Sequence, residues 1–379
     1  MREFFKSSSN RVAIVLFIGL VLLIAHYPGQ PLLKYVFLPR IGMALLLGTT
    51  AILVIFHWRK LKQGSLGPKS IWIPLAVIAG SGVARLVVQQ DLYTLAGACF
   101  MVSMFGLYVV SRQYGEKALN LFMPLVIVGA IGIIMDAAVS GNAKNSGLFT
   151  NYASAAEFLV FGFIVSPRKY QWWLSAIVIT GLFFSGAEEG IFYVAVVGVA
   201  VLLRRDWSRK LLLPVGILAG LLVVCTALGI TQQLTGRAVT MVESAYIVVT
   251  DNSLTIEERD ALLDVALNGR WTNGWKIQRA IKPLGYGVDI THLSKAIPHN
   301  IILMVTDQLG PIATVAWVAF IIAGVKNTKW KYGFLVIAML GVWQPYVWTI
   351  MLPWSWVLAG AATGSSASDY IFKGVVATQ

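Results

Sequence analysis

The chain has 379 residues, of which 57% are hydrophobic and only 12% are charged, and its formal net charge is +13. The mean hydropathy of +0.74 lies far from the soluble average and excludes an ordinary soluble globular protein. The positive charge would indicate nucleic-acid binding in a soluble protein. Here membrane topology and anionic lipid headgroups account for it, so we expect membrane lipids and no nucleic acid as partners.

Apolar segments recur along the chain, and a membrane span needs about 20 mostly apolar residues. The candidate spans are 12–27, 41–57, 71–88, 92–111, 118–139, 152–167, 171–186, 190–203, 211–231, 300–325, 332–347 and 350–364. Several of them are short, so roughly eleven to thirteen spans would also fit the pattern. We therefore expect an all-α polytopic membrane protein with about 12 transmembrane helices, folded as a single membrane domain over residues 1–379.

The distribution of basic residues predicts how these spans are oriented. Short loops rich in Lys and Arg alternate with loops poor in them, and translocated short loops are depleted of such cations. The basic loops, which we expect on the cytoplasmic side, are 59–69, 112–117, 168–169, 204–210 and 326–331. Both termini are therefore expected to be cytoplasmic.

One large polar excursion, residues 232–298, separates the ninth predicted span from the tenth and is expected to be an external loop. Loops of this length are usually functional or disordered, and this one carries helix signals. Thr255 and Glu258 have the spacing of a capping box, which predicts an amphipathic helix over 256–267 on the outer membrane surface. A second short helix is expected over 270–281, with two tryptophans one turn apart at the membrane interface.

Basic residues remain in this external loop, against the usual trend for translocated segments. Arg270, Lys276, Arg279 and Lys282 lie close to the expected membrane interface. Guanidinium groups bind phosphate oxygens in bidentate fashion, and a pyrophosphate needs more than one cation to offset its charge. For each of these residues, a solvated polar face or contact with lipid headgroups is the alternative interpretation.

The end of the loop carries two further candidates. Residues 283–287 (PLGYG) indicate a turn whose glycines allow positive φ angles and close approach of the backbone to a ligand. His299 and Asn300 come immediately before the apolar segment 301–325, where a side chain can face both water and a membrane cavity. Histidine accepts a proton near neutral pH, as a base that activates a hydroxyl must do. A histidine at a helix end can also serve as a cap or as a hydrogen-bonding partner.

This passage as a whole resembles the carboxy-terminal signature of the O-antigen ligase family. The family comprises multi-span glycosyltransferases and includes surface-polysaccharide polymerases and O-oligosaccharyltransferases. The matching pieces are Gly269-Arg270-Trp271, Trp275, the turn 283–287, His299-Asn300 with Leu303, Gln308-Leu309-Gly310 and, upstream, Gly147-Leu148-Phe149-Thr150-Asn151. Each piece is short, and the resemblance lies in their joint order and intervals on a matching topology.

The resemblance implies transfer of a glycan from an undecaprenyl-pyrophosphate carrier to an acceptor hydroxyl on the external face of a bacterial inner membrane. The transfer would invert the anomeric carbon and require no metal or other cofactor, and the acceptor would be a glycolipid, a glycan chain or a protein. Arg270 would hold the pyrophosphate, and His299 would orient or deprotonate the acceptor hydroxyl. The other expected substrate contacts are Asn300, Arg279, Lys276, Lys282, Gly285, Tyr286, Gly287, Asn151, Arg85 and Glu189.

The chain departs from the family pattern at two points. Family members commonly carry a Ser-Arg-Gly step at the outer end of a core helix, where residues 185–189 of this chain read SGAEE. Two acids there would repel a pyrophosphate unless they were neutralised. Either Arg85, Arg237 or Arg279 is expected to supply the second cation, or the donor chemistry differs. The acidic position before the last glycine is occupied by Gln308.

Charges within or beside the predicted spans are expected to face a cavity, because an unpaired charge in lipid costs a few kcal/mol. Arg85 is expected to pair with Glu157, Glu188 or Glu189. A transporter or flippase is an alternative, since carriers also contain buried charges, but carriers usually show repeats with binding sites at mid-membrane. A noncatalytic subunit of a membrane complex is a further alternative. The gathering of polar residues at one outer face favours the transferase.

Overall fold

The computed structural model describes residues 48, 55, 66–141, 145–147, 152–166, 170–186, 230–266, 281–287, 300–343 and 352–364. The regular structure in these ranges is entirely helical, as the sequence predicts. Two of the helices, Lys69–Val88 and Ala118–Ser140, are long and apolar enough to cross a membrane. The predicted spans 12–27 and 190–203 lie outside the described residues, as do most of 41–57 and 211–231.

Most helices of the described bundle correspond to predicted spans and begin and end within a few residues of them. They are α4 (Lys69–Val88), α5 (Leu92–Tyr114), α6 (Phe122–Ser140), α7 (Tyr152–Val165), α8 (Gln171–Ser185), α15 (Lys331–Trp343) and α17 (Leu352–Thr363). The 3-10 helix η1 (Gly115–Leu121) joins α5 to α6. Apolar composition therefore located these elements, because each one buries an apolar face against its neighbours.

The prediction of one continuous span over 300–325 was wrong. The structure has two helices there, α13 (Ile301–Leu309) and α14 (Pro311–Asn327), which are separated at Gly310. Gly310 has a φ of 86°, which interrupts the helical backbone, and Pro311 then begins α14 at a position where a missing N–H is harmless. The hydroxyls of Thr306 and Thr314 meet at 2.8 Å across the break. The Gly310-Pro311 pair was the signal for this break in the sequence.

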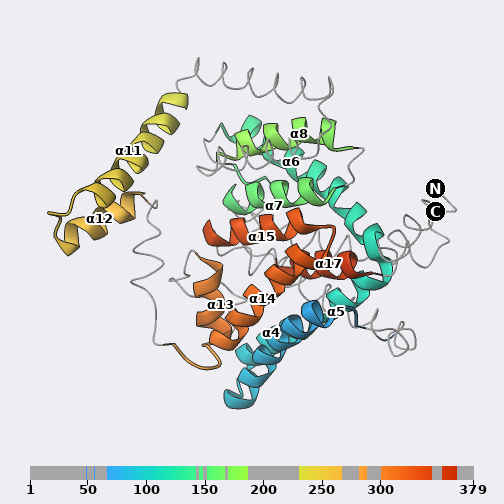
Figure 1. Ribbon diagram of the computed structural model, residues 1–379. Helices are drawn as coiled ribbons and strands as arrows, with labels where there is room; N and C mark the ends of the chain where they lie inside the picture. Colours follow the sequence, from blue (N-terminus) through green and yellow to red (C-terminus); the bar gives the residue numbers. More distant parts are fainter. Residues whose placement is uncertain are drawn as a thin grey trace, which may run out of the picture.

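The bundle helices pack in a closed circuit (Figure 1). The helices α6, α7 and α8 contact one another, α15 lies between α7 and α14, and α4 packs on both α14 and α5. The helix α17 then packs on α5 and η1, and η1 leads back to α6. Small residues allow the closest approaches: a Cβ placed on Gly360 of α17 would overlap the main-chain carbonyl of Tyr108 on α5. Small residues at helix contacts are typical of helices that associate within membranes.

Aromatic side chains fill the centre of the bundle. The indole of Trp354 on α17 packs against Phe158 and Phe161 of α7, with ring centroids 4.0 Å and 5.8 Å away. Phe122 at the start of α6 completes this cluster at 6.2 Å from the Trp354 ring. Trp354, Phe122, Phe158 and Phe161 are all nearly or completely buried, so α6, α7 and α17 are held together by this contact.

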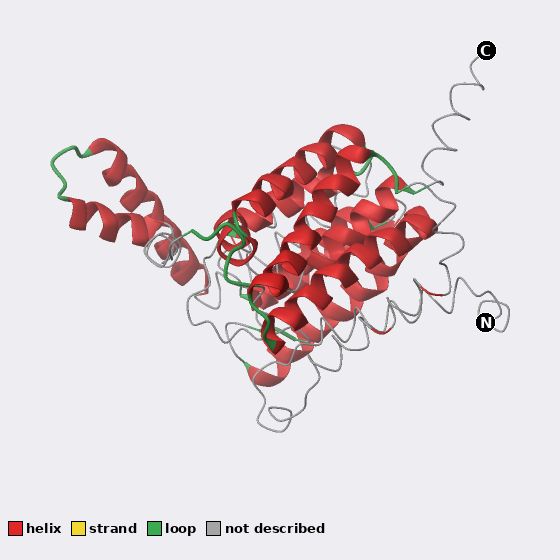
Figure 2. Ribbon diagram, turned by 90° about the horizontal axis from the view of Figure 1, so that it is seen from below, coloured by secondary structure: helices red, strands yellow, loops and turns green. Residues whose placement is uncertain are grey.

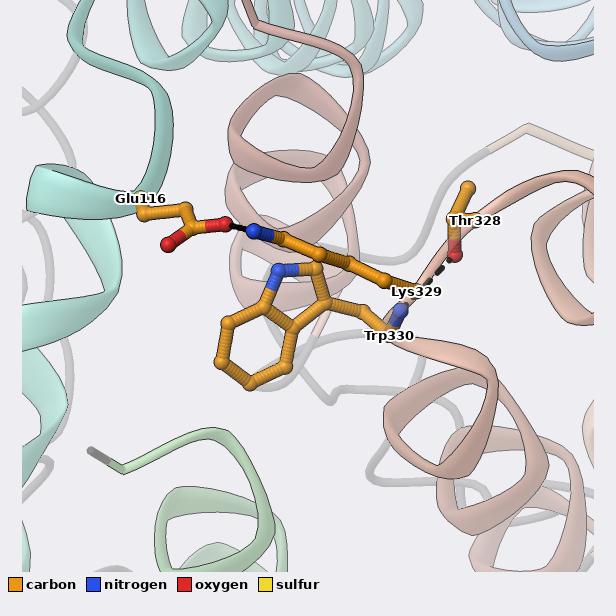
Figure 3. A network of polar contacts seen from close by, with 4 residues as sticks. All are labelled: Glu116, Thr328, Lys329 and Trp330. Atoms are coloured by element: carbon orange, nitrogen blue, oxygen red, sulfur yellow. Dashed lines mark hydrogen bonds and ion pairs between the residues drawn. The ribbon is translucent and has the colours of Figure 1, made fainter. Parts of the chain in front are cut away.

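One end of the bundle gathers basic residues and will be called the cationic end. Its members are Lys69, Arg112, Lys326, Lys329 and Lys331. Lys329 forms an ion pair with Glu116 beside Trp330, and the Trp330 amide donates to the hydroxyl of Thr328 at 3.2 Å (Figure 3). Asn327 donates to Ser70 at 3.2 Å, and Arg112 donates to the carbonyl of Thr363. Loops predicted to lie on one side of the membrane therefore meet at one end of the bundle.

The outward face of α6 is apolar. Val128, Ile131, Met135 and Val139 are exposed and follow one another at helical spacing along a single face. The helix α14 has a similar exposed face that includes Ile312 and Val315. Exposed apolar faces of this length are unusual on a soluble monomer and fit contact with lipid.

A helical hairpin lies apart from the bundle (Figure 2). It consists of α11 (Ile230–Thr250) and α12 (Ile256–Ala266), which pack on each other. The helix predicted over 256–267 is confirmed within one residue, and so is its capping box. The Thr255 amide donates to the Glu258 carboxylate at 3.0 Å, and the Glu258 amide donates to the Thr255 hydroxyl at 3.3 Å. The sequence analysis did not predict α11, which occupies a part of the expected loop.

The capping box makes the start of α12 sensitive to acid. The Thr255 hydroxyl, and then its amide, donate to the Glu258 carboxylate and hold the pKa of Glu258 below its ordinary value of 4.5. Because the folded-state pKa is the lower one, the stabilisation is complete above the ordinary value and is lost as the pH falls through the lowered value. We expect amide protection in the first turn of α12, corrected for the intrinsic exchange rate, to decrease over that range.

Two substitutions locate this effect. Glu258→Gln should remove most of the pH dependence of protection in the first turn of α12. Glu257→Gln, next to it and outside the capping box, should leave the dependence in place. Equal pH profiles for the two variants would show that the capping box does not control this turn.

Candidate functional site

The turn predicted at 283–287 is fixed against the end of α13 by main-chain hydrogen bonds. The Tyr286 amide donates to the carbonyl of Asp307 at 2.7 Å, and the Gly287 amide donates to the carbonyl of Gln308 at 3.0 Å. Within the turn, the Gly285 amide donates to the carbonyl of Lys282 at 3.0 Å. Two segments about 20 residues apart in the sequence therefore form one unit, which satisfies carbonyls that the end of α13 leaves open.

Two glycines make this contact possible. Gly285 has a φ of +64°, and a Cβ on it would overlap the main-chain carbonyl of Gln308. Gly310 has a φ of +86°, and a Cβ on it would overlap the carbonyl of Pro283. Gly285 in the turn therefore packs against the end of α13, and Gly310 after α13 packs against the turn. The positive φ angles that the sequence indicated for the turn are confirmed at Gly285 and Gly287.

Asn300 begins α13, as predicted for a residue at a helix start. Its side-chain oxygen accepts hydrogen bonds from the amides of Ile302 at 2.8 Å and Leu303 at 3.3 Å. This is the usual arrangement of an N-cap residue. The side-chain oxygen of Asn300 therefore stabilises the helix, which is a structural role that the sequence analysis did not assign to it.

Lys282 and Tyr286 lie together on the surface of the turn. The ammonium group of Lys282 is 4.2 Å from the centroid of the Tyr286 ring, which is within the range of a cation–π contact. Lys282 is exposed, whereas Gly285 and Gly287 are buried. The turn thus presents a cation held over an aromatic ring, supported by a tightly packed backbone.

Arg85 lies at the same end of the bundle as this turn. It is one helical turn from Gly82, where a Cβ would be 3.9 Å from the side chain of Leu309 in α13. Arg85 donates to the side-chain oxygen of Gln89, and Gln89 donates to the carboxylate of Asp91 at 2.6 Å. The Nε atom of Arg85 is buried, and none of the described residues accepts a hydrogen bond from it.

The structure describes one of the three acids predicted to pair with Arg85. Glu157 is completely buried in α7, and Arg85 instead hydrogen-bonds Gln89. Glu188 and Glu189, the other two predicted partners, lie outside the described residues. Gln89 and Asp91 were not predicted from the sequence. Their positions four and six residues after Arg85, at the junction of two predicted helices, were the available signal.

Asn145–Gly147, which ends in the first residue of the upstream signature, is held at the C-terminal ends of α6 and α8. The Asp136 carboxylate accepts from the amides of Ser146 and Gly147, both at 3.0 Å. Asn145 donates to the carbonyl of Phe184 at 2.9 Å. A Cβ on Gly147, whose φ is +55°, would lie 2.5 Å from main-chain atoms of α6. Gly333 at the start of α15 packs near Val165 at the end of α7, so the end of α15 lies toward the start of α7, which follows this segment. Gly341 near the end of α15 also approaches Ile301 of α13, so this segment lies toward the end of the bundle that carries the turn.

Several predicted site residues lie outside the described residues. They are Arg270, His299, Lys276, Arg279, Asn151 and Glu189, together with the side chain of Arg237. The described members of the set, Arg85, Lys282, Gly285, Tyr286, Gly287 and Asn300, all lie at the end of the bundle opposite the cationic end. This end will be called the site end. An exposed ammonium and a half-buried guanidinium give it the chemistry to attract an anion.

No known protein family has a model that matches this chain. No curated protein matches its sequence.

Proposed function

We propose that this protein is a metal-independent glycosyltransferase of the O-antigen ligase type. It moves a glycan from an undecaprenyl-pyrophosphate carrier to an acceptor hydroxyl at the external face of a bacterial inner membrane. The single observation that supports this most is the contact between the turn 283–287 and Gln308-Leu309-Gly310. The resemblance selects these two pieces of sequence separately, and in the fold they form one unit.

The separation of charge along the bundle also supports the proposal. The basic loops that the sequence analysis assigns to the cytoplasm meet at the cationic end, and the described site residues lie at the opposite end. With about twelve spans and both termini in the cytoplasm, as we propose, the site is on the external side. A carrier with a long polyprenyl tail requires such a site, open both to lipid and to water.

In the proposed reaction, the acceptor hydroxyl attacks the anomeric carbon of the carrier-linked glycan. A carbon–oxygen bond to the acceptor forms, the bond to the pyrophosphate breaks, and the carrier leaves as undecaprenyl pyrophosphate. His299 orients the hydroxyl and accepts its proton, and Arg270 offsets the charge of the departing pyrophosphate. Arg85 is our candidate for the second cation, since its Nε is buried and lacks a described acceptor.

The proposal is tested in cells that lack this chain. We expect a glycan linked to polyprenyl pyrophosphate to accumulate on the external face of the inner membrane, where a glycosidase added to spheroplasts can reach it. Restoring the chain should remove the accumulated species. Accumulation only on the cytoplasmic face would instead indicate a flippase, and no accumulation on either face would contradict the proposal.

A further inference from the structure

The hairpin exposes an apolar stripe on α11. The stripe consists of Val239, Val242, Tyr246 and Val249, which are 54%, 69%, 68% and 80% exposed. Their spacing of three, four and three residues places them on one face of the helix. A face of this kind is normally covered, because each exposed valine leaves apolar surface in water.

The stripe is not the contact between the two helices of the hairpin. The helix α12 packs on α11, where Ser244 is 5% exposed, and Leu262 and Leu263 of α12 are half-buried. Ser244 lies on the side of α11 that is turned away from the stripe, given about 100° of rotation per residue. The apolar stripe therefore faces outward from the hairpin, and the described residues leave it uncovered.

Charge is distributed unequally between the two helices. The helix α12 carries Glu257, Glu258, Asp260 and Asp264 against one cation, Arg259. Among the described side chains of α11, residues 239–250, Glu243 is the one charged group. The hairpin thus has a side formed by α11 that carries the apolar stripe and one described charge, and an acidic side formed by α12.

We infer that the stripe of α11 lies on the lipid surface at the external face of the membrane. Valine side chains suit the acyl boundary, and a tyrosine suits the headgroup level. Anionic headgroups would repel α12, and docking through the stripe keeps the carboxylates on the side of the water. The sequence analysis assigned the membrane contact to the helix at 256–267. The longer stripe assigns it to α11 instead, because α12 exposes two large apolar side chains, Ile256 and Val265, against four in the stripe.

The size of the stripe argues against a second copy of the chain as its occupant. A stable protein interface uses about 20–30 residues on each side. The stripe offers four residues, with Ile247 further round the helix. A helix that lies on a bilayer needs no complementary partner, and four apolar side chains along about three turns fit such a contact.

The inference rests on the membrane placement in the proposed function and is independent of glycan transfer. It is tested by attaching nitroxide labels to single cysteines in the chain reconstituted in liposomes, with Cys99 and Cys225 replaced by serine. Val242→Cys and Val249→Cys report on the stripe. Met135→Cys on the exposed face of α6 is the lipid reference, and Glu257→Cys on α12 is the water reference. Collision rates of each label with oxygen and with a water-soluble nickel chelate are compared.

We expect labels at 242 and 249 to have an oxygen-to-nickel collision ratio severalfold higher than the label at 257 and close to that of the label at 135. A ratio equal to that of the label at 257 would overturn the inference. Low access of both reagents to the labels at 242 and 249 would also overturn it. Dipolar broadening between labels would then indicate that a second copy of the chain covers the stripe. Without such broadening, the result would indicate contact with another part of the protein. If the label at 135 also reports water, the membrane placement itself fails, which is a distinguishable result.

Discussion

Gly285→Ala is expected to detach the turn 283–287 from α13 and to lower the unfolding temperature strongly. The new Cβ would overlap the main-chain carbonyl of Gln308, which has no flexible end that could move aside. An alanine at positive φ costs about 1–2 kcal/mol, and overpacking adds about 1–3 kcal/mol. Thermal unfolding of the purified chain in detergent measures the combined backbone and overpacking penalties. Glycan transfer should be lost as well, because the turn supports the proposed substrate contacts.

Gly141→Ala is the matched control for this prediction. Gly141 has a φ of +62°, almost the same as the +64° of Gly285, and a Cβ on it would meet nothing within 4 Å. Its substitution should therefore produce only the backbone penalty of about 1–2 kcal/mol. The difference in unfolding temperature between Gly285→Ala and Gly141→Ala therefore reports the contact between the turn and α13. Equal shifts in unfolding temperature would show that the contact does not exist.

Arg270→Ala and His299→Ala are each expected to abolish glycan transfer. Removing a group that stabilises developing charge typically costs about 100- to 1,000-fold in rate. Loss of a general base costs about 100- to 10,000-fold. Both losses would be measured as initial rates with the purified chain in liposomes, supplied with a carrier-linked glycan and an acceptor. Protein level and membrane insertion should be unchanged.

Two controls from the same part of the chain separate these roles from general loss of charge. Arg259→Ala removes an exposed arginine of α12. His292→Ala removes a histidine that lies outside the segments of resemblance. Both variants should retain activity close to that of the unmodified chain. If Arg270→Ala or His299→Ala were equally active, that residue would lose its assigned role.

Local and compositional signals predicted much of the fold. The capping box of Thr255 and Glu258 is set by residues three apart, so its sequence pattern was sufficient to predict the start of α12. The bundle helices α4 to α8 followed from apolar length alone. The break at Gly310 was not predicted, although Gly310-Pro311 is a local signal for it in the sequence. Similarly, α11 is less apolar than the predicted spans and carried no cap signal that we recognised.

The candidate site was predictable to a smaller extent. The glycines of the turn and the helix start at Asn300 followed from residue type and position. The partners of Arg85 did not, because a cation near acidic residues in sequence can choose among several of them once the helices pack. Among the described residues, Arg85 bonds Gln89, which lies one helical turn beyond it on the same face and was therefore a local signal.

The central claim is tested most directly by the purified, unmodified chain in liposomes. The donor lipid is extracted from cells that lack the chain, the acceptor comes from membranes of the same cells, and divalent metal ions are chelated. We expect the glycan to move to the acceptor while undecaprenyl pyrophosphate is released in equal amount. If the chain is folded and inserted but the donor stays intact, the protein is not a transferase.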